Sequence, residues 1–191
     1  MGKGIIIYQS KYGATKKYAD WLRAETGYDC IETKKATLSL VQDYDIIVLG
    51  GGVYASGIAG FQFLKKNISL LSDKKIAVFA VGASPYDEKA IAQSRELHFK
   101  DALSRIPLFY CRGAWDEDKM SFAHRMLCRM LQKAVAKQNP EEYEPWQSAL
   151  MAARGQKCDW TDRDNLQPLL KYLRESESEE DLQTYCNRIT F

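Results

Sequence analysis

Residues 5–15, IIIYQSKYGAT, are the stretch that decides the fold. A short apolar run is followed by a polar loop with a glycine at position 13, and then by apolar residues at helical spacing. This order predicts a buried strand that turns directly into a helix. A helix N-terminus has backbone N–H groups without intrahelical acceptors and a partial positive charge, so a turn of this kind favours an anion.

The residues of this turn have the chemistry of a phosphate site. Gly13 allows the backbone to wrap closely around a ligand, and the nearby hydroxyl groups are hydrogen-bond donors. Lys16 and Lys17 lie in the first helical turn, where each cation opposes the helix dipole by ~0.3–1 kcal/mol, so a nearby anion would explain them. Judged from this loop alone, an ordinary capped turn with solvated lysines explains the residues as well as a phosphate site does. The predicted phosphate-binding residues are Ser10, Lys11, Tyr12, Gly13, Ala14 and Thr15.

Working outward, apolar strand-like runs alternate with helical patterns through the first two thirds of the chain. The predicted strands cover residues 5–8, 30–33, 46–49, 76–81 and 107–111. This alternation predicts an α/β fold: a doubly wound, five-stranded parallel sheet of order 2-1-3-4-5, with helices on both faces.

The last third of the sequence is helical. A helix over residues 122–137 has an apolar stripe, which we expect to cover the sheet. Four cations spaced four residues apart are expected on the opposite face: Arg125, Arg129, Lys133 and Lys137. We expect a single domain over residues 1–191, with extra C-terminal helices, an insertion at 139–158 and a tail at 176–191.

A glycine-rich stretch after the third strand has two interpretations. The spacing Gly50-x-Gly52-x-x-Ala55 fits a dinucleotide fingerprint, but no acidic residue follows at the end of the next strand to hold a ribose. In a sheet of order 2-1-3-4-5, ligands bind where the strand order reverses, between the carboxyl ends of strands one and three. The absence of a GxxxxGK[ST] motif excludes a nucleoside triphosphate P-loop.

An aromatic ligand with one phosphate fits this edge of the sheet, because two further loops bring tyrosines there. For either tyrosine alone, simple loop packing is the more common role, but two at one rim favour stacking on a flavin ring. The predicted ring-binding residues are Gly51, Gly52, Val53, Tyr54, Ala55, Ser56 and Gly57 in the second loop, and Ala83, Ser84, Tyr86 and Asp87 in the third.

Composition excludes several other classes of protein. The net charge of +2, without a concentrated basic and aromatic stretch, does not favour nucleic acid. Five dispersed cysteines and two histidines predict reduced thiols in a cytoplasm and no metal site. No apolar run approaches the ~20 residues that span a bilayer.

At these loops the chain resembles the flavodoxin family, which implies the fold and FMN as cofactor. Residues 10–15 resemble the hydroxyl-rich phosphate loop of that family, and residues 52–57 and 83–87 resemble the loops that bracket the isoalloxazine ring. The stretches GGGVYASGIAGFQFLKKN, IPLFYCRGAWDEDKMSFAHRMLCRMLQK and DWTDRDNLQPLLKYL also resemble the flavodoxin-type, menaquinone-dependent protoporphyrinogen oxidases.

No catalytic constellation of side chains stands out, so the chemistry is expected to belong to the cofactor. One function is an FMN-dependent oxidoreductase acting on a small organic substrate or quinone. The alternative is a non-enzymatic electron carrier that docks onto redox partners. Carriers of the resembled family are usually strongly acidic, so the charge of +2 favours the oxidoreductase. The basic helix 122–137 predicts either weak contact with the inner membrane face or, through the acidic tail, a homo-oligomer.

Overall fold

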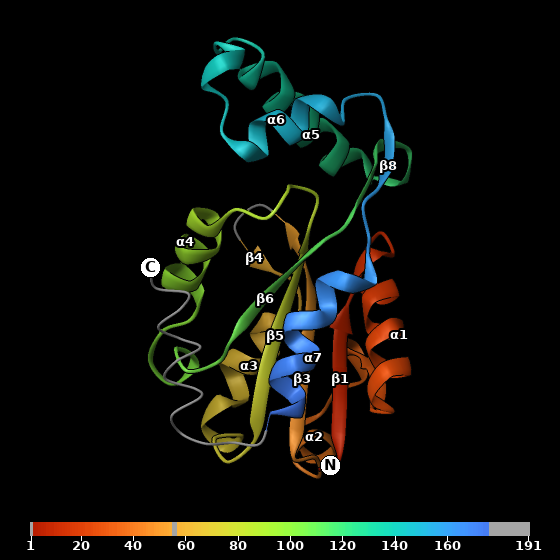
Figure 1. The fold of residues 1–191 in the computed structure, drawn as a ribbon, viewed down its shortest axis with the longest axis vertical. Coiled ribbons are helices and arrows are strands. Elements are labelled where there is room, and N and C mark those ends of the chain that lie inside the picture. Colours follow the sequence, from red (N-terminus) through yellow and green to blue (C-terminus); the bar gives the residue numbers. More distant parts are fainter. Residues whose placement is uncertain (1, 55–56, 176–191) are drawn as a thin grey trace.

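The computed structural model describes residues 2–54 and 57–175, which form a parallel sheet with helices on both faces (Figure 1). The sheet contains β1 (Gly4–Gln9), β2 (Asp29–Glu32), β3 (Ile46–Tyr54), β5 (Lys75–Gly82) and β6 (Leu108–Arg112). These strands are parallel and lie in the order β2-β1-β3-β5-β6. Because β5 and β6 are the fourth and fifth parallel strands, the predicted order 2-1-3-4-5 is confirmed.

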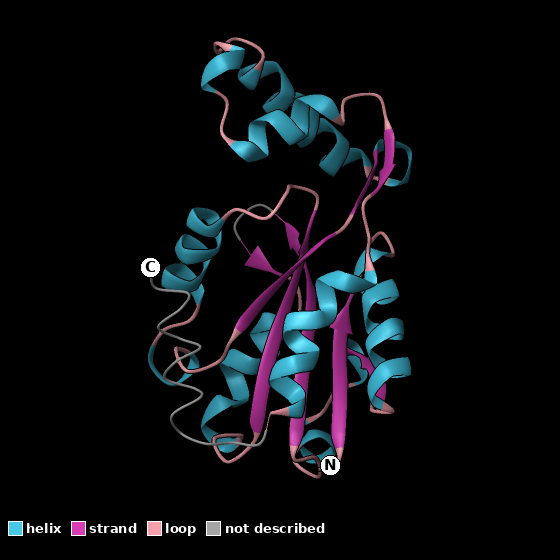
Figure 2. Ribbon diagram, viewed as in Figure 1, coloured by secondary structure: helices cyan, strands magenta, loops and turns pink. Residues whose placement is uncertain are grey.

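Helices lie on both faces of the sheet (Figure 2), and two apolar clusters fill the space between them and the strands. Helices α1 (Ala14–Thr26) and α7 (Gln167–Arg174) cover one face. Helices α2 (Leu38–Val41), α3 (Phe61–Asn67) and α4 (Glu88–His98) cover the other. Short 3₁₀ helices cover Thr33–Lys35, Ile68–Leu70, Asp101–Leu103, Glu117–Lys119, Pro140–Glu142 and Arg163–Leu166.

The prediction that the glycine-rich stretch forms a loop after the third strand is wrong for its first three glycines. Strand β3 continues through Gly50, Gly51 and Gly52 and pairs with β5 along all three. The strand then enters a hairpin with the short β4 (Gly57–Ile58). A Cβ at Gly50 would lie 2.1 Å from the Phe79 ring, and one at Gly51 would lie 2.2 Å from the Ala59 carbonyl oxygen. Close packing inside the sheet therefore requires these glycines.

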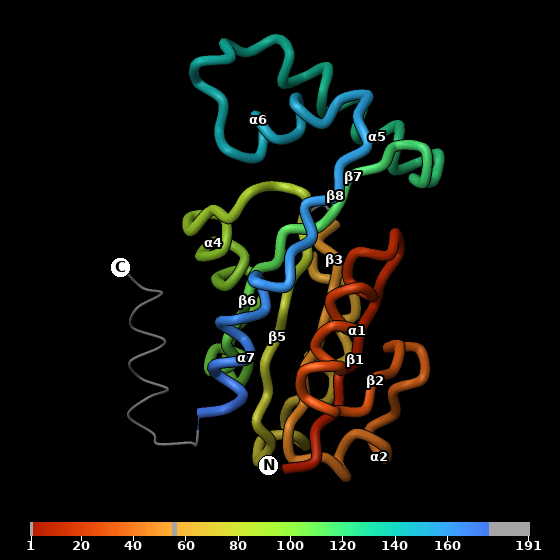
Figure 3. The backbone as a smooth tube through the Cα atoms, turned by 45° about the vertical axis from the view of Figure 1, so that its right-hand side comes forward, coloured from red at the N-terminus to blue at the C-terminus, as the bar shows by residue number. Residues whose placement is uncertain are grey.

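Residues 113–160 form a helical lobe that projects beyond the carboxyl ends of the strands (Figures 1 and 3). The chain enters through β7 (Ala114–Asp116) and returns through β8 (Lys157–Asp159), which pair antiparallel as a neck. Between them lie α5 (Phe122–Val135) and α6 (Pro145–Ala152). The predicted insertion at 139–158 is thus only the second half of a larger lobe.

The expectation that the apolar stripe of α5 covers the sheet is wrong. Phe122 is 79% exposed and Met130 is 61% exposed, because the neck carries α5 away from the sheet. Helix α7 occupies the covering position instead, with Leu169, Leu170 and Leu173 buried against the strands. Among residues 2–54 and 57–175, no helix has the length and apolar character needed to cross a membrane.

Helix α5 ends at Val135, so Lys137 lies beyond it, and the other three cations do not oppose its apolar stripe. Residues three apart are neighbours on a helix surface, so Arg125 lies beside Phe122 and Arg129 lies beside Met126. The basic row and the apolar stripe therefore form one continuous, mixed surface. Of the acidic stretch 175–181, the alternative partner predicted for these cations, Glu175 lies 3.7 Å from Lys171 at the end of α7, and the remaining residues lie outside the described part of the chain.

Candidate functional site

The loop between β1 and α1 contains an uncapped helix N-terminus. Gly13 has φ 103°, in the left-handed region that favours glycine, and no side chain caps the helix. The Ser10 Oγ accepts the Gly13 N–H at 3.2 Å, and the first helical bond runs from Lys17 N to Gly13 O at 3.0 Å. The backbone N–H groups just before that bond have no intrahelical acceptors. The Thr15 side chain is buried directly behind this turn.

The two first-turn lysines are balanced within the chain. Lys16 Nζ lies 2.5 Å from Asp20, and Lys17 Nζ lies 2.9 Å from Asp159. The nearby negative charge that the sequence argument expected is supplied by Asp20 of the next helical turn and by Asp159 of the neck, so these two lysines are not evidence for a bound phosphate. Lys11 is the cation that remains at the loop itself.

Three rings from three parts of the chain meet beside this loop. Tyr12 and Tyr54 lie 6.1 Å apart between centroids in an edge-to-face arrangement, and His124 of α5 lies 5.7 Å from Tyr54. The Tyr12 hydroxyl lies 2.7 Å from Nδ1 of His124, and Lys11 Nζ lies 3.3 Å from its Nε2. Burial raises the pKa of the Tyr54 hydroxyl. Sequence reasoning missed His124 because it is separated from Tyr12 by 112 residues, and no local pattern marks it.

The remaining residues of the second predicted loop have mixed environments. Gly51 and Gly52 lie inside β3, whereas Val53 is 40% exposed at the strand end, ahead of Tyr54. Gly57 begins β4, and a Cβ there would meet no atom within 4 Å. Ala55 and Ser56 lie outside the described residues.

The third predicted loop connects β5 to α4. Asp87 is the N-cap of α4, accepting the backbone N–H groups of Lys89 and Ala90. The Ser84 carbonyl accepts the hydroxyl of Tyr110 at 2.6 Å, and burial raises the pKa of Tyr110. Tyr86 is 62% exposed, and its ring centroid lies 6.3 Å from that of Tyr110. Tyr54 instead contacts Tyr12 and His124. The Ala83 carbonyl accepts Nε of Arg112 at 3.4 Å.

A groove of about 520 Å³ runs along the edge strand β6 below this loop. Its lining is mainly aromatic and apolar, with one arginine and one carboxylate. The lining residues are Pro85, Tyr86, Ile91, Leu108, Phe109, Tyr110, Arg112, Asp164, Asn165 and Pro168.

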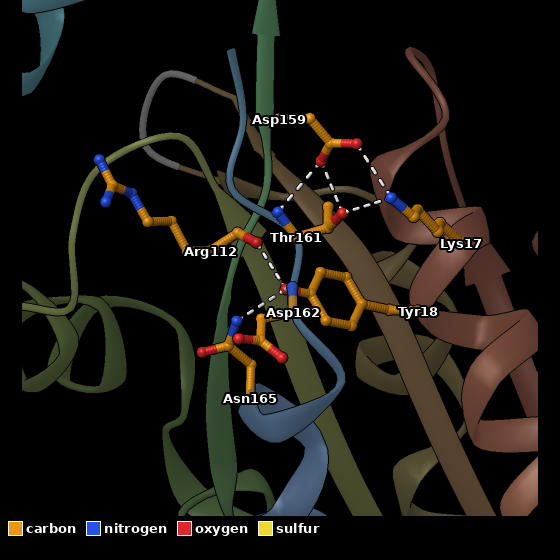
Figure 4. A network of polar contacts seen from close by, with 7 residues as sticks. All are labelled: Lys17, Tyr18, Arg112, Asp159, Thr161, Asp162 and Asn165. Atoms are coloured by element: carbon orange, nitrogen blue, oxygen red, sulfur yellow. Dashed lines mark hydrogen bonds and ion pairs between the residues drawn. The ribbon is translucent and has the colours of Figure 1, made fainter.

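The buried Tyr18 of α1 binds the two segments that flank the lobe (Figure 4). Its hydroxyl donates to the Arg112 carbonyl at 2.6 Å and accepts from Asp162 N at 3.0 Å and from Asn165 Nδ2 at 2.8 Å. Burial raises the pKa of this hydroxyl. One phenol thus joins the end of β6 to the segment that returns from the lobe.

A second, exposed cluster reinforces the neck. The Asp159 carboxylate accepts the Thr161 hydroxyl at 2.6 Å and Lys17 Nζ at 2.9 Å (Figure 4). These hydrogen bonds, that from Thr161 first, lower the pKa of Asp159 to about 2. Both clusters attach the lobe to the first two turns of α1, directly behind the predicted phosphate loop.

The residues at this edge of the sheet fit a phosphate monoester joined to an aromatic ring system. The uncapped N-terminus of α1, the hydroxyls of Ser10 and Tyr12, and the ammonium of Lys11 form a donor set for one phosphate. The Tyr54 ring lies next to this donor set, at the reversal of strand order between β1 and β3.

Fold and site together define an α/β protein of the doubly wound class, with its candidate ligand site at the reversal of strand order. A sequence model described as a flavodoxin domain matches residues 5–142, and the chain belongs to this flavodoxin-like family. The comparison with curated proteins returned no match.

Several solved structures are similar to the chain. The Trp repressor binding protein from Bacillus subtilis is 16% identical, with a TM-score of 0.45 over 58% of this chain and 84% of that one. Oxidised flavodoxin 1 from Bacillus cereus is 20% identical, with a TM-score of 0.41 over 61% and 88%. A flavoprotein in complex with FMN from Lactobacillus acidophilus is 19% identical, with a TM-score of 0.38 over 59% and 93%.

Proposed function

We propose that the protein binds FMN noncovalently and is an oxidoreductase acting on a small organic substrate or quinone. The observation that carries the proposal is the uncapped N-terminus of α1, with hydroxyl donors and Lys11 on one side and the Tyr54 ring on the other. Membership of the flavodoxin-like family supports a flavin as the ligand.

Bound FMN would supply reversible electron transfer to or from an organic substrate. The chain's own residues then have three tasks. The loop after β1 binds the phosphate, Tyr54 and the loop between β5 and α4 orient the ring, and the lobe excludes water from above the strands.

The position of the lobe supports a small substrate over a large docking protein. It lies over the carboxyl ends of the strands, where the predicted ring-binding loops are (Figure 1). His124 brings the first turn of α5 into contact with the phosphate loop. A protein partner would have to approach past this lobe, whereas a small molecule would not. The sequence resemblance to menaquinone-dependent protoporphyrinogen oxidases makes quinones and protoporphyrinogen the first reactants to test.

The exposed surface of α5 supports a peripheral contact with an anionic membrane on the cytoplasmic side. Five apolar side chains on this helix are 41–79% exposed. No acidic residue occurs in α5. A helix with an apolar surface bordered by cations binds at a lipid interface, and each cation near an anionic surface contributes ~1 kcal/mol. The two adjacent apolar rows are Phe122, Met126 and Met130, and Leu127 and Leu131. The bordering cations are Lys133, Arg129, which lies 4.0 Å from Glu117, and Arg125, which donates to the carbonyls of Asp118 and Met120.

The proposed function is tested first by identifying the bound flavin. The purified protein is denatured and the released flavin is separated by chromatography, and the apoprotein is titrated with FMN, FAD and riboflavin. FMN is expected to bind most tightly, because the loop offers one phosphate site. Preference for FAD, or no flavin binding, overturns the proposal.

The reaction class is tested by anaerobic reduction followed by mixing with quinones or with protein acceptors. Steady turnover with a quinone or a small donor supports the oxidoreductase. Reoxidation by protein acceptors alone supports the electron carrier and overturns the oxidoreductase.

A further inference from the structure

His124 is the point at which the helical lobe meets the predicted phosphate loop. It lies in the first turn of α5, where its backbone N–H bonds to the N-cap Ser121 at 3.5 Å. Its ring reaches Lys11 and Tyr12 of the loop and stacks at a tilt of 41° against Tyr54. The sheet domain and the lobe thus share this one imidazole.

The contacts of His124 define its tautomer. A lysine ammonium can only donate, so Nε2 of His124 accepts from Lys11. The ring proton is then on Nδ1, which donates to the Tyr12 oxygen at 2.7 Å. The hydroxyl proton of Tyr12 is left to donate to a further acceptor beside the N-terminus of α1.

Protonation of His124 would change this arrangement. An imidazolium has no acceptor nitrogen, so the bond from Lys11 would be lost, and two cations would lie about 3.3 Å apart. Among the described residues, the groups in contact with the ring are Lys11 and Tyr12 from the loop and Tyr54 from β3, and none of these three is acidic. On α5 itself, the neighbouring charge is Arg125. A dianionic ligand between Lys11 and His124 would remove the repulsion, because both cations would donate to it.

We infer that His124 is a positioning residue of the phosphate site, which orders Lys11 and Tyr12 as a neutral ring and becomes a cationic partner of a bound phosphate monoester. The inference rests on the proposed function. If it holds, phosphate binding and attachment of the lobe depend on each other, because the His124 ring contacts both the loop and the lobe. A flavin without a phosphate would gain no affinity from His124.

The test compares FMN with riboflavin in three proteins, the wild type, His124→Gln and His98→Gln. Glutamine keeps a polar side chain of similar reach but cannot be protonated. His98 is the chain's other histidine and contacts Phe61 on the far side of the sheet, so its variant is a matched control. Dissociation constants are measured by quenching of flavin fluorescence between about pH 6 and pH 8.5, the range across which histidine titrates.

The wild type and His98→Gln are expected to bind FMN more tightly, relative to riboflavin, as the pH falls. His124→Gln is expected to bind FMN about tenfold more weakly at the acidic end and to show little of this pH dependence, since one charge-assisted hydrogen bond is lost. Protonation of the FMN phosphate itself affects all three proteins equally, so the difference between proteins isolates the ring.

Equal FMN affinity in His124→Gln and wild type, or an equal loss for riboflavin, overturns the inference while leaving FMN binding intact. Failure of the wild type to bind FMN overturns the proposed function as well. Circular dichroism establishes that each variant folds. If His124→Gln does not fold, the wild-type profile alone decides, because a flat ratio of FMN to riboflavin affinity across this range contradicts a protonatable partner.

Discussion

At the scale of single residues, the hydroxyls of the phosphate loop carry the ligand prediction. The Ser10 oxygen already accepts the Gly13 N–H, so its own proton remains available for a ligand. Thr15 lies at the buried base of the same turn. Ser10 thus has a structural contact within the loop, and Thr15 is buried in the first turn of α1. The contact of both hydroxyls with a phosphate is a prediction.

Replacing both, as Ser10→Ala with Thr15→Ala, is expected to weaken FMN binding by at least tenfold without unfolding the domain. Each hydrogen bond to a charged acceptor contributes ~1.5–3 kcal/mol. Fluorescence titration measures the affinity, with riboflavin as the control ligand. An affinity for FMN within a few-fold of wild type would show that the phosphate lies elsewhere.

Two buried tyrosines allow the contribution of a hydrogen-bonded hydroxyl to the free energy of unfolding to be compared with that of a hydroxyl without a partner. Tyr18 makes three hydrogen bonds to the segments that flank the lobe, whereas the buried Tyr28 hydroxyl has no partner among the described residues. Tyr18→Phe is expected to lower the free energy of unfolding by ~1–3 kcal/mol, because buried polar groups lose their partner. Tyr28→Phe is expected to be neutral or stabilising. Urea unfolding measures both, and equal effects would contradict the assigned role of Tyr18.

At the scale of elements, the neck β7–β8 decides where the lobe lies, and its attachment is partly electrostatic. Asp159 has a lowered pKa of about 2 in the folded protein, below the ordinary value of an aspartate. A carboxyl of this kind contributes stability above its unfolded pKa and loses it as the pH falls through the folded value. The Asp159 side chain is 58% exposed, so solvent screens the contribution strongly.

Asp159→Asn is therefore expected to destabilise the protein only slightly near neutral pH, by up to ~1 kcal/mol. The difference from wild type should shrink as the pH falls below about 4 and vanish only below about pH 2, as the wild-type carboxylate becomes protonated in the folded protein. Thermal unfolding at a series of pH values measures the difference. A deficit that stays constant down to the acid limit would assign the effect to packing, not charge.

At the scale of the whole molecule, the lobe gives the protein an exposed mixed surface in addition to its sheet core. The apolar rows of α5 are exposed, and the basic row borders them. A contiguous exposed apolar patch of this kind marks an interaction site. Its charge favours an anionic membrane, and its apolar rows also allow contact with a second copy of the chain.

The prediction is that the protein co-sediments with anionic but not neutral vesicles, and that physiological salt weakens the binding. Phe122→Ser with Met130→Ser should abolish it, because the two most exposed of the five apolar side chains on α5 are lost. Leu70→Ser is the matched control, since Leu70 is 62% exposed on a different part of the chain. Equal partitioning onto neutral and anionic vesicles, or none onto either, rules out the membrane contact. Concentration-dependent dimerisation that the double variant abolishes would indicate a second copy instead.

The sequence by itself determined the sheet, its order and the strand-to-helix turn after β1. These features are local, because each depends on a few neighbouring residues. The relevant signals are apolar runs of strand length, apolar residues at helical spacing and the glycine at position 13. The strand order follows from the alternation of elements, since parallel strands with helical connections have few allowed arrangements. The predicted position of the phosphate loop depended only on this local information.

The tertiary structure alone decided the positions of α5, His124 and the glycines of β3. An amphipathic stripe indicates that a helix has an apolar face, but not which surface covers it, and the neck moved α5 away from the sheet. The sequence alone predicts a turn at Gly50, whereas in the structure Gly50 is required because the Phe79 ring of the neighbouring strand packs against it. His124 reaches Tyr12 across 112 residues of sequence. Contacts of this kind depend on packing between distant segments, which no local pattern encodes.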